Sequence, residues 1–128
     1  MYIFTPNEAL SIIATKDPDT LLVRSRTAGD IEKFLRVKSF EMKGGKPVFT
    51  IPNEFDLTIR VNAGTDYKYR ASASRARVMA AALYGLSGLH YDNVKGACRG
   101  NRAALMAGVW AAYLTSPISE SLHEIVDA

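Results

Sequence analysis

The chain has 128 residues, a formal net charge of +3 and one cysteine, and 48% of its residues are hydrophobic. This length fits one domain, and the average composition excludes disordered, collagen-like and membrane-spanning proteins. One cysteine and two histidines exclude an internal disulfide and a four-ligand zinc site. We expect a single domain over residues 1–128 without metal or cofactor. Because Met1–Thr5 lacks the features of a signal peptide, we expect the protein to be cytoplasmic and to have no membrane partner.

The first third of the sequence predicts short strands followed by a helix. Turn-forming residues separate three expected strands, at Tyr2–Phe4, Ala9–Ala14 and Thr20–Arg26. Thr27 comes directly afterwards and predicts the N-terminal cap of a helix. The spacing of Ile31, Phe34 and Leu35 indicates the buried stripe of that helix.

The middle third is rich in strand and turn signals. Lys43-Gly44-Gly45-Lys46 predicts a hairpin turn, because glycine adopts positive φ without steric strain. The hairpin would join Phe40–Met42 to Val48–Ile51. Alternation of apolar and polar side chains over residues 57–61 predicts a further strand with one buried face.

The last third is helical. Ser74 predicts the cap of a helix over Arg75–Ser87, and Gly88 its C-terminal end. Four apolar side chains repeat along this helix at helical spacing: Ala76, Met79, Leu83 and Leu86. A second helix, Asn101–Leu114, is nearly uncharged and would have to be covered on most sides. A short final helix beginning at Ser116-Pro117 is expected within an acidic tail.

The order of these elements indicates an α+β domain, with a mainly antiparallel sheet and helices packed on one face. Two strand–helix units, Leu21–Leu35 and Asp66–Leu86, are compatible with a ferredoxin-like arrangement. Residues 40–61 are interpreted as an inserted hairpin, and residues 116–128 as an acidic tail.

An ordered set of short blocks extends over most of the chain: Phe4-Thr5, Ser11-Ile12-Ile13, Asp17–Arg26, Gly29–Glu32, Asp66–Ala71, Ser74-Arg75 and His90–Lys95. This set resembles a family of small uncharacterised proteins of bacteria and their phages or mobile elements. Residues 39–59 and the tail after Thr115 depart from the family pattern. The resemblance implies a prokaryotic or phage context, in which many small proteins disable host defences, anti-CRISPR proteins among them. It assigns no activity and no site residue.

Positive charge is concentrated in residues 65–114, which carry a net charge of +5. Five cations lie at the starts of the two long helices: Arg75, Arg77, Lys95, Arg99 and Arg102. If the two helix starts are close together, these side chains and the free backbone N–H groups would bind a phosphate or a carboxylate surface. Alternatively, the cations pair with local acids such as Asp66 or Asp92, or lie in solvent.

Tyr67 and Tyr69 alternate with Lys68 and Arg70 in one more expected strand. Aromatic and basic residues on an open sheet are typical of proteins that stack the bases of single strands. The other interpretation places the tyrosine rings in the core, with their hydroxyl groups reaching its edge.

The sequence contains no motif of known catalytic spacing. His90 and His123 are not arranged as zinc ligands, and Gly44-Gly45-Lys46 lacks the first glycine of a phosphate-binding loop. Cys98 is interpreted as a buried thiol. We therefore assign no catalytic residue.

We expect a non-enzymatic binding or inhibitory protein that covers an acidic surface of a host protein or protein complex. The hairpin and the acidic tail are its expected contacts. One alternative is a nucleotide- or nucleic-acid-binding protein that uses the cluster of cations at the two helix starts. Lys68 and Arg70 are further candidate residues for binding an anion or a partner. Another is an enzyme with an unrecognised site. A basic chain of this kind would not imitate DNA.

Overall fold

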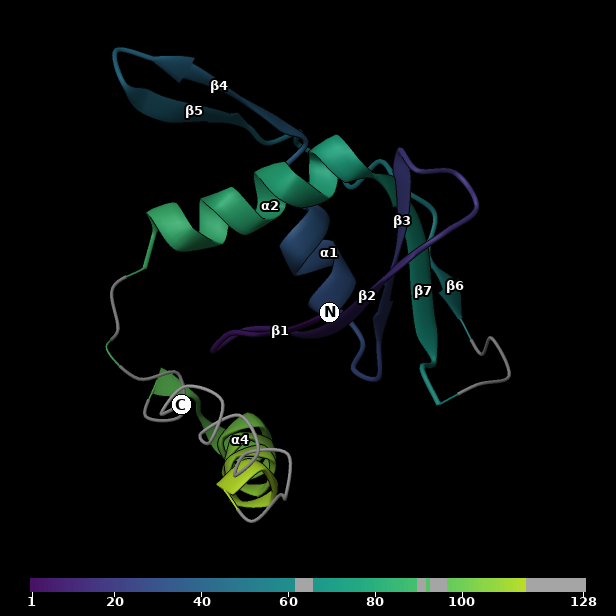
Figure 1. Ribbon diagram of the computed structural model, residues 1–128, viewed down its shortest axis with the longest axis vertical. Helices are drawn as coiled ribbons and strands as arrows, with labels where there is room; N and C mark the ends of the chain where they lie inside the picture. Colours follow the sequence, from purple (N-terminus) through teal and green to yellow (C-terminus); the bar gives the residue numbers. More distant parts are fainter. Residues whose placement is uncertain (62–65, 90–91, 93–96, 115–128) are drawn as a thin grey trace, which may run out of the picture. The chain divides into compact units, whose positions relative to one another are not determined.

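A computed structural model of the protein describes residues 1–61, 66–89, 92 and 97–114. The chain divides into two compact units, Met1–His90 and Tyr91–Ala128 (Figure 1). The described part of the first unit contains a five-stranded sheet, a two-stranded hairpin and two helices, and that of the second contains one long helix. The fold is α+β with a mainly antiparallel sheet.

The five-stranded sheet is antiparallel at every pairing. Its strands, in spatial order, are β1 (Tyr2–Phe4), β2 (Ala9–Ala14), β3 (Thr20–Ser25), β7 (Tyr69–Ser74) and β6 (Arg60–Val61). The turn between β2 and β3 is closed by Asp17, whose carboxylate accepts the backbone N–H of Asp19 and the hydroxyl of Thr20, each at 2.9 Å. Such side-chain bonds explain why this Asp-Pro-Asp segment reverses the chain.

The strand order contradicts a ferredoxin-like arrangement. In that arrangement another strand separates the two strands that flank a helix, as its split βαβ motif requires. Here β3, which precedes α1, and β7, which precedes α2, are direct antiparallel neighbours. β1, β2 and β3 form a meander closed by short turns, and β7 pairs with the free edge of β3, so no strand lies between β3 and β7.

Helix α1 (Asp30–Leu35) begins two residues later than expected. Its N-cap is Gly29, which has a φ of 88°, a backbone conformation that favours glycine. The predicted cap Thr27 is wrong, because its backbone N–H and carbonyl both bond to the hydroxyl of Ser25. The carboxylate of Asp30 accepts the backbone N–H of Ala9 at 2.9 Å, which ties the start of the helix to β2.

The predicted hairpin is confirmed as a separate two-stranded sheet, β4 (Ser39–Lys43) and β5 (Lys46–Thr50). Its two turn glycines, Gly44 and Gly45, have φ values of 59° and 77°. Positive φ at both positions matches the twist of the flanking strands. The strand predicted over residues 57–61 is shorter, because only Arg60–Val61 pairs with β7.

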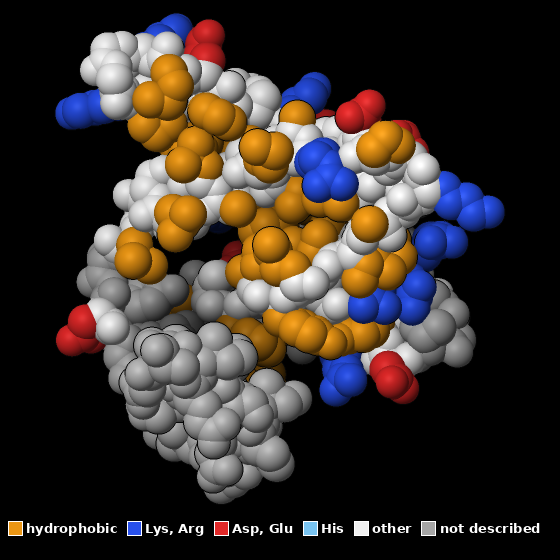
Figure 2. Space-filling view, in the orientation of Figure 1, with side chains coloured by type: hydrophobic (Ala, Val, Ile, Leu, Met, Phe, Trp, Pro, Cys, Tyr) orange, Lys and Arg blue, Asp and Glu red, His pale blue; other side chains and the backbone are white. Residues whose placement is uncertain are grey.

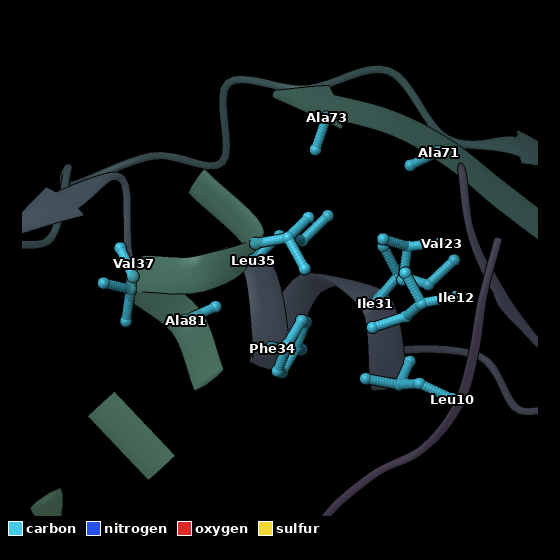
Figure 3. Packing of buried hydrophobic residues seen from close by; sticks show 12 residues of the cluster. Leu10, Ile12, Val23, Ile31, Phe34, Leu35, Val37, Ala71, Ala73 and Ala81 are labelled. Atoms are coloured by element: carbon cyan, nitrogen blue, oxygen red, sulfur yellow. The ribbon is translucent and has the colours of Figure 1, made fainter. Parts of the chain in front are cut away.

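Helices α1 and α2 (Arg75–Ser87) cover one face of the sheet (Figure 1). Ile31 of α1 packs beside Val23 of β3 and Ile12 of β2, and these three side chains form the centre of the core (Figure 3). Burying one aliphatic side chain of this kind stabilises the fold by about 1.5–3 kcal/mol.

Helix α2 begins and ends at the residues that the sequence predicted. The hydroxyl of Ser74 accepts the backbone N–H of Arg77 at 3.1 Å, as expected of a cap, and Gly88 follows the last turn.

The buried face of α2 differs from the apolar face that the spacing indicated. Met79 and Leu86 are 61% and 69% exposed, whereas Val78, Ala80 and Ala81 are buried. Small alanine side chains let the helix approach α1 and β4 closely, so packing selects the face with the smaller side chains.

The second unit contains α4 (Gly100–Leu114), one residue longer at its start than the expected helix. Gly100, at its start, has a φ of 58°, and Met106 and Cys98 are buried. The expected final helix and the acidic tail 116–128 lie outside the described residues. None of the helices in the described ranges has the length and apolar character needed to span a bilayer.

Candidate functional site

The two faces of the five-stranded sheet carry different side chains. Successive side chains of a strand point to opposite faces, so Leu21, Val23 and Ser25 of β3 face the helices. Leu22 and Arg24 face the other way. We call this second side the open face, because both helices of the first unit pack on the opposite side.

One row of paired residues crosses the open face from edge to edge. Its members, in spatial order, are Tyr2, Ser11, Arg24, Arg70 and Arg60, one from each strand. Residues directly opposite each other in antiparallel strands lie on the same face. The three arginines, which we call the arginine row, therefore lie side by side on neighbouring strands.

Adjacent like charges in a sheet destabilise it by about 0.2–1 kcal/mol per pair. Among the described residues, neither Arg24 nor Arg60 has an ion-pair partner, and the same holds for Arg26 just beyond β3. Arg24, Arg26 and Arg60 are thus cations without a carboxylate partner in this part of the chain. Figure 2 shows Lys and Arg side chains gathered over the part of the first unit where β3, β7 and β6 lie.

The ring of Tyr67 contacts Arg24 of β3 and Arg26 just beyond this strand. The guanidinium carbon of Arg24 lies 4.4 Å from the centre of the Tyr67 ring, and that of Arg26 lies 5.2 Å from it. Arg24 also donates from Nη2 to the hydroxyl of Ser11 at 2.6 Å. Its Nε is buried and has no hydrogen-bond partner within the described part of the chain. Cation–π contacts of this kind order a guanidinium group without neutralising its charge.

The hydroxyl group of Tyr67 has a lowered pKa, and hydrogen bonds are its main cause. Burial acts to raise the pKa of Tyr67, whereas hydrogen bonding to Tyr2 and Ser11 lowers it. The charges of Arg24 and Arg26 lower it further, and the resulting pKa lies below the ordinary value of 10.0. The hydrogen bond with Tyr67 raises the pKa of Tyr2.

The β1 end of the row is aromatic. The rings of Tyr2 and Phe4 lie nearly parallel, with their centres 6.3 Å apart and an interplanar angle of 14°. Tyr2 is 65% exposed. The open face therefore combines an exposed aromatic ring at one edge with three cations beyond it.

Arg77 does not belong to an exposed cluster. Its side chain is only 7% exposed, its Nη2 lies 2.7 Å from a carboxylate oxygen of Asp56, and its Nε donates to the carbonyl of Leu35 at 3.1 Å. The expectation that Arg77 binds an external anion is therefore wrong. The first turn of α2 faces the loop that contains Asp56, which neutralises this cation inside the fold.

The other predicted site residues of the first unit separate from one another. Arg75 donates from Nε to the carbonyl of Pro18 at 2.7 Å and so joins α2 to the β2–β3 turn. Lys68 is exposed, and its ammonium lies 5.8 Å from the ring centre of Tyr69. Of the predicted cations of this unit, Arg70 alone belongs to the arginine row.

The remaining predicted cations belong to the second unit. Arg99 donates from Nη1 to the carbonyl of Cys98 at 2.9 Å, next to the start of α4, and Arg102 lies in its first turn. Lys95 lies outside the described residues. Within the described ranges, no three His, Cys, Asp or Glu side chains are grouped as they would be around a metal ion.

Sequence reasoning missed Tyr2, Arg24 and Arg60 as site residues. A signal was present, because Arg24 and Arg60 occupy polar positions of alternating strands. Single strands do not reveal register, however, and only the pairing places these residues beside Arg70.

Neither a protein-family model, nor a curated protein, nor a solved structure matches this chain.

Proposed function

We propose that this protein binds nucleic acid on the open face of its sheet, with phosphate groups lying along the arginine row. The observation that supports this proposal is the row itself, in which Arg24, Arg70 and Arg60 are paired directly across three strands. Guanidinium groups bind phosphate oxygens in a planar, two-pronged geometry, and a phosphate chain supplies regularly spaced negative charges.

The energetics favour a repeating anion. A phosphate between two neighbouring arginines replaces their repulsion with two charge-assisted hydrogen bonds, which are about twice as strong as neutral ones. Arg26 lies beside the row, on the ring of Tyr67. If these four arginines each neutralise one phosphate, the logarithm of the association constant should fall against the logarithm of salt concentration with a slope of about −3 to −4.

Fluorescence anisotropy with a labelled oligonucleotide of mixed sequence, between 50 and 200 mM salt, tests the proposal. Arg60→Gln should weaken binding and make the slope less steep by about one, because it removes one phosphate contact. Lys33→Gln removes the same charge from an exposed position on α1, away from the open face, and should change neither quantity. The proposal fails if the wild-type protein does not bind, or if the two variants behave alike.

A protein partner is a second candidate, supported by the hairpin. Met42 is 58% exposed near its tip, and Val48 is also exposed. Lys43 and Lys46 are opposite each other beside the turn, and because Lys43 pairs with Glu41 at 3.1 Å, Lys46 supplies the net positive charge of the tip. An inhibitory protein that covers an acidic surface with apolar anchors would use such an arm.

The second candidate predicts a complex that nuclease treatment leaves intact. Met42→Ser should release that partner and leave nucleic-acid affinity unchanged, because the hairpin forms a sheet separate from the arginine row. A captured partner that dissociates after nuclease treatment would instead favour the open face. Retention of the partner by both Met42→Ser and Lys43→Glu would exclude the hairpin as its binding site.

A further inference from the structure

We infer that the nucleic acid bound by the open face is single-stranded, with a base stacked on Tyr2 at the β1 edge. This inference rests on the proposed function and specifies its ligand. Its basis is that one cross-strand row contains both an exposed aromatic ring and three arginines.

The width of the sheet argues against a duplex. Five strands separated by about 4.8 Å make the row about 19 Å long from Tyr2 to Arg60. The major groove of a DNA duplex is about 12 Å wide and admits a helix or a two-stranded ribbon. A five-stranded face is too wide to enter it, so a duplex would offer this face phosphates alone.

The aromatic edge is useful only to an unpaired base. In a duplex the faces of the bases are already stacked on one another, whereas in a single strand they are free to stack on protein rings. Tyr2 is more than half exposed, and the ring of Phe4 on the same strand lies nearly parallel to it, with the two ring centres 6.3 Å apart. Phe4 thus supports the ring that would receive the base.

Tyr67 has a different role on the same face. Its ring is already in contact with the guanidinium groups of Arg24 and Arg26, and its hydroxyl interacts with Tyr2 and Ser11. We assign it as a positioning residue that orients the cations for phosphate. The base-stacking position is therefore Tyr2 rather than Tyr67.

The row also limits the length of the bound strand. A stacked strand advances about 3.4 Å per nucleotide, so 19 Å corresponds to at most about six nucleotides. An extended strand would cross the same distance with fewer. Affinity should accordingly rise with oligonucleotide length up to about six nucleotides, and then increase only through the number of equivalent positions.

The experiment compares a labelled twelve-nucleotide strand with the same sequence annealed to its complement. Tyr2→Leu should weaken binding of the single strand by about five- to hundredfold and leave its salt slope unchanged, because the substitution removes stacking and no phosphate contact. Tyr2→Phe keeps the ring but loses the hydrogen bond to Tyr67, and should restore most of the affinity that Tyr2→Leu loses. Tyr2→Leu should have no effect on the duplex.

The outcomes separate this inference from the function on which it rests. If neither oligonucleotide binds, the proposed function fails. If the duplex binds as tightly as the single strand, and Tyr2→Leu changes neither, the protein binds phosphates on the arginine row and the single-strand inference is overturned. A series of oligonucleotides of three, six and twelve nucleotides tests the inference on the wild-type protein. If affinity does not rise between three and six nucleotides, the single-strand inference is also overturned.

Discussion

The two faces of the five-stranded sheet are built by the same strands but carry different side chains, apolar on the covered face and cationic on the open face. On the covered face, Val23 and Ala71 pair across β3 and β7 and are closed over by Ile31. The neighbouring pair, Arg24 after Val23 and Arg70 before Ala71, lies on the open face. The covered face stabilises the fold by excluding water, whereas the open face places arginines on neighbouring strands opposite each other.

The two environments of arginine in this protein make the same contrast. Arg77 is buried in the first turn of α2 and has the carboxylate of Asp56 and the carbonyl of Leu35 as partners. Arg24 lies on the open face and has an aromatic ring and a hydroxyl, neither of which carries a negative charge. The buried guanidinium group of Arg77 is neutralised inside the fold. The guanidinium group of Arg24 is ordered but not neutralised, so an external anion can complete its site.

The largest expected effect on stability comes from the covered face. Ile31→Ala removes a fully buried side chain from the centre of the core and should lower the free energy of unfolding by about 2–5 kcal/mol. Urea denaturation followed by circular dichroism measures the change. Nucleic-acid affinity of the folded fraction should stay the same, and a selective loss of affinity would mean that the two faces are coupled.

Replacing the buried cation should have a smaller effect. Arg77→Met leaves the carbonyl of Leu35 without its guanidinium donor and should destabilise the protein by about 1–3 kcal/mol. Thermal unfolding of this variant beside Arg75→Met, which removes an exposed cation from the same helix turn, isolates the contribution of burial. Equal losses of stability would contradict the internal role of Arg77.

The partner of Arg77 gives this contact a pH dependence. The hydrogen bond from Arg77 outweighs desolvation and lowers the pKa of Asp56 below its ordinary value of 3.8. The stabilisation is therefore fully present above that value and is lost as the pH falls through the lowered pKa. Unfolding measured between pH 7 and pH 2 should show a loss of stability in this acidic range that is smaller in Asp56→Asn. Identical pH profiles for the two proteins would contradict this assignment.

The smallest expected effect has the opposite sign. Arg60→Gln relieves one like-charge pair with Arg70 and should raise the free energy of unfolding by about 0.2–1 kcal/mol at low salt. High salt should remove this gain by screening. Differential scanning calorimetry at two salt concentrations measures both. A substitution that stabilises the protein and weakens nucleic-acid binding would show that the open face is maintained for binding.

Local sequence signals were sufficient for much of the fold. The Gly44-Gly45 turn, the cap at Ser74 and the alternation along β3 each depend on residues adjacent in sequence, and each led to an element that the structure contains. They were also sufficient for the α+β class, because the order of strands and helices limits the layers that can form.

The cap of α1 shows where local signals fail. Thr27 and Gly29 are both acceptable N-cap residues. The contact between Asp30 and the backbone of Ala9, twenty-one residues away in sequence, favours the later start.

The candidate site required the tertiary structure. Periodicity groups Met79 with Leu86 correctly, but it does not indicate whether the face they share is turned inward, because that depends on the volumes of neighbouring elements. In the same way, Arg24, Arg70 and Arg60 are far apart in sequence and meet only through strand register. Register is a property of pairs of strands, and a shift of one residue would send these cations to the covered face.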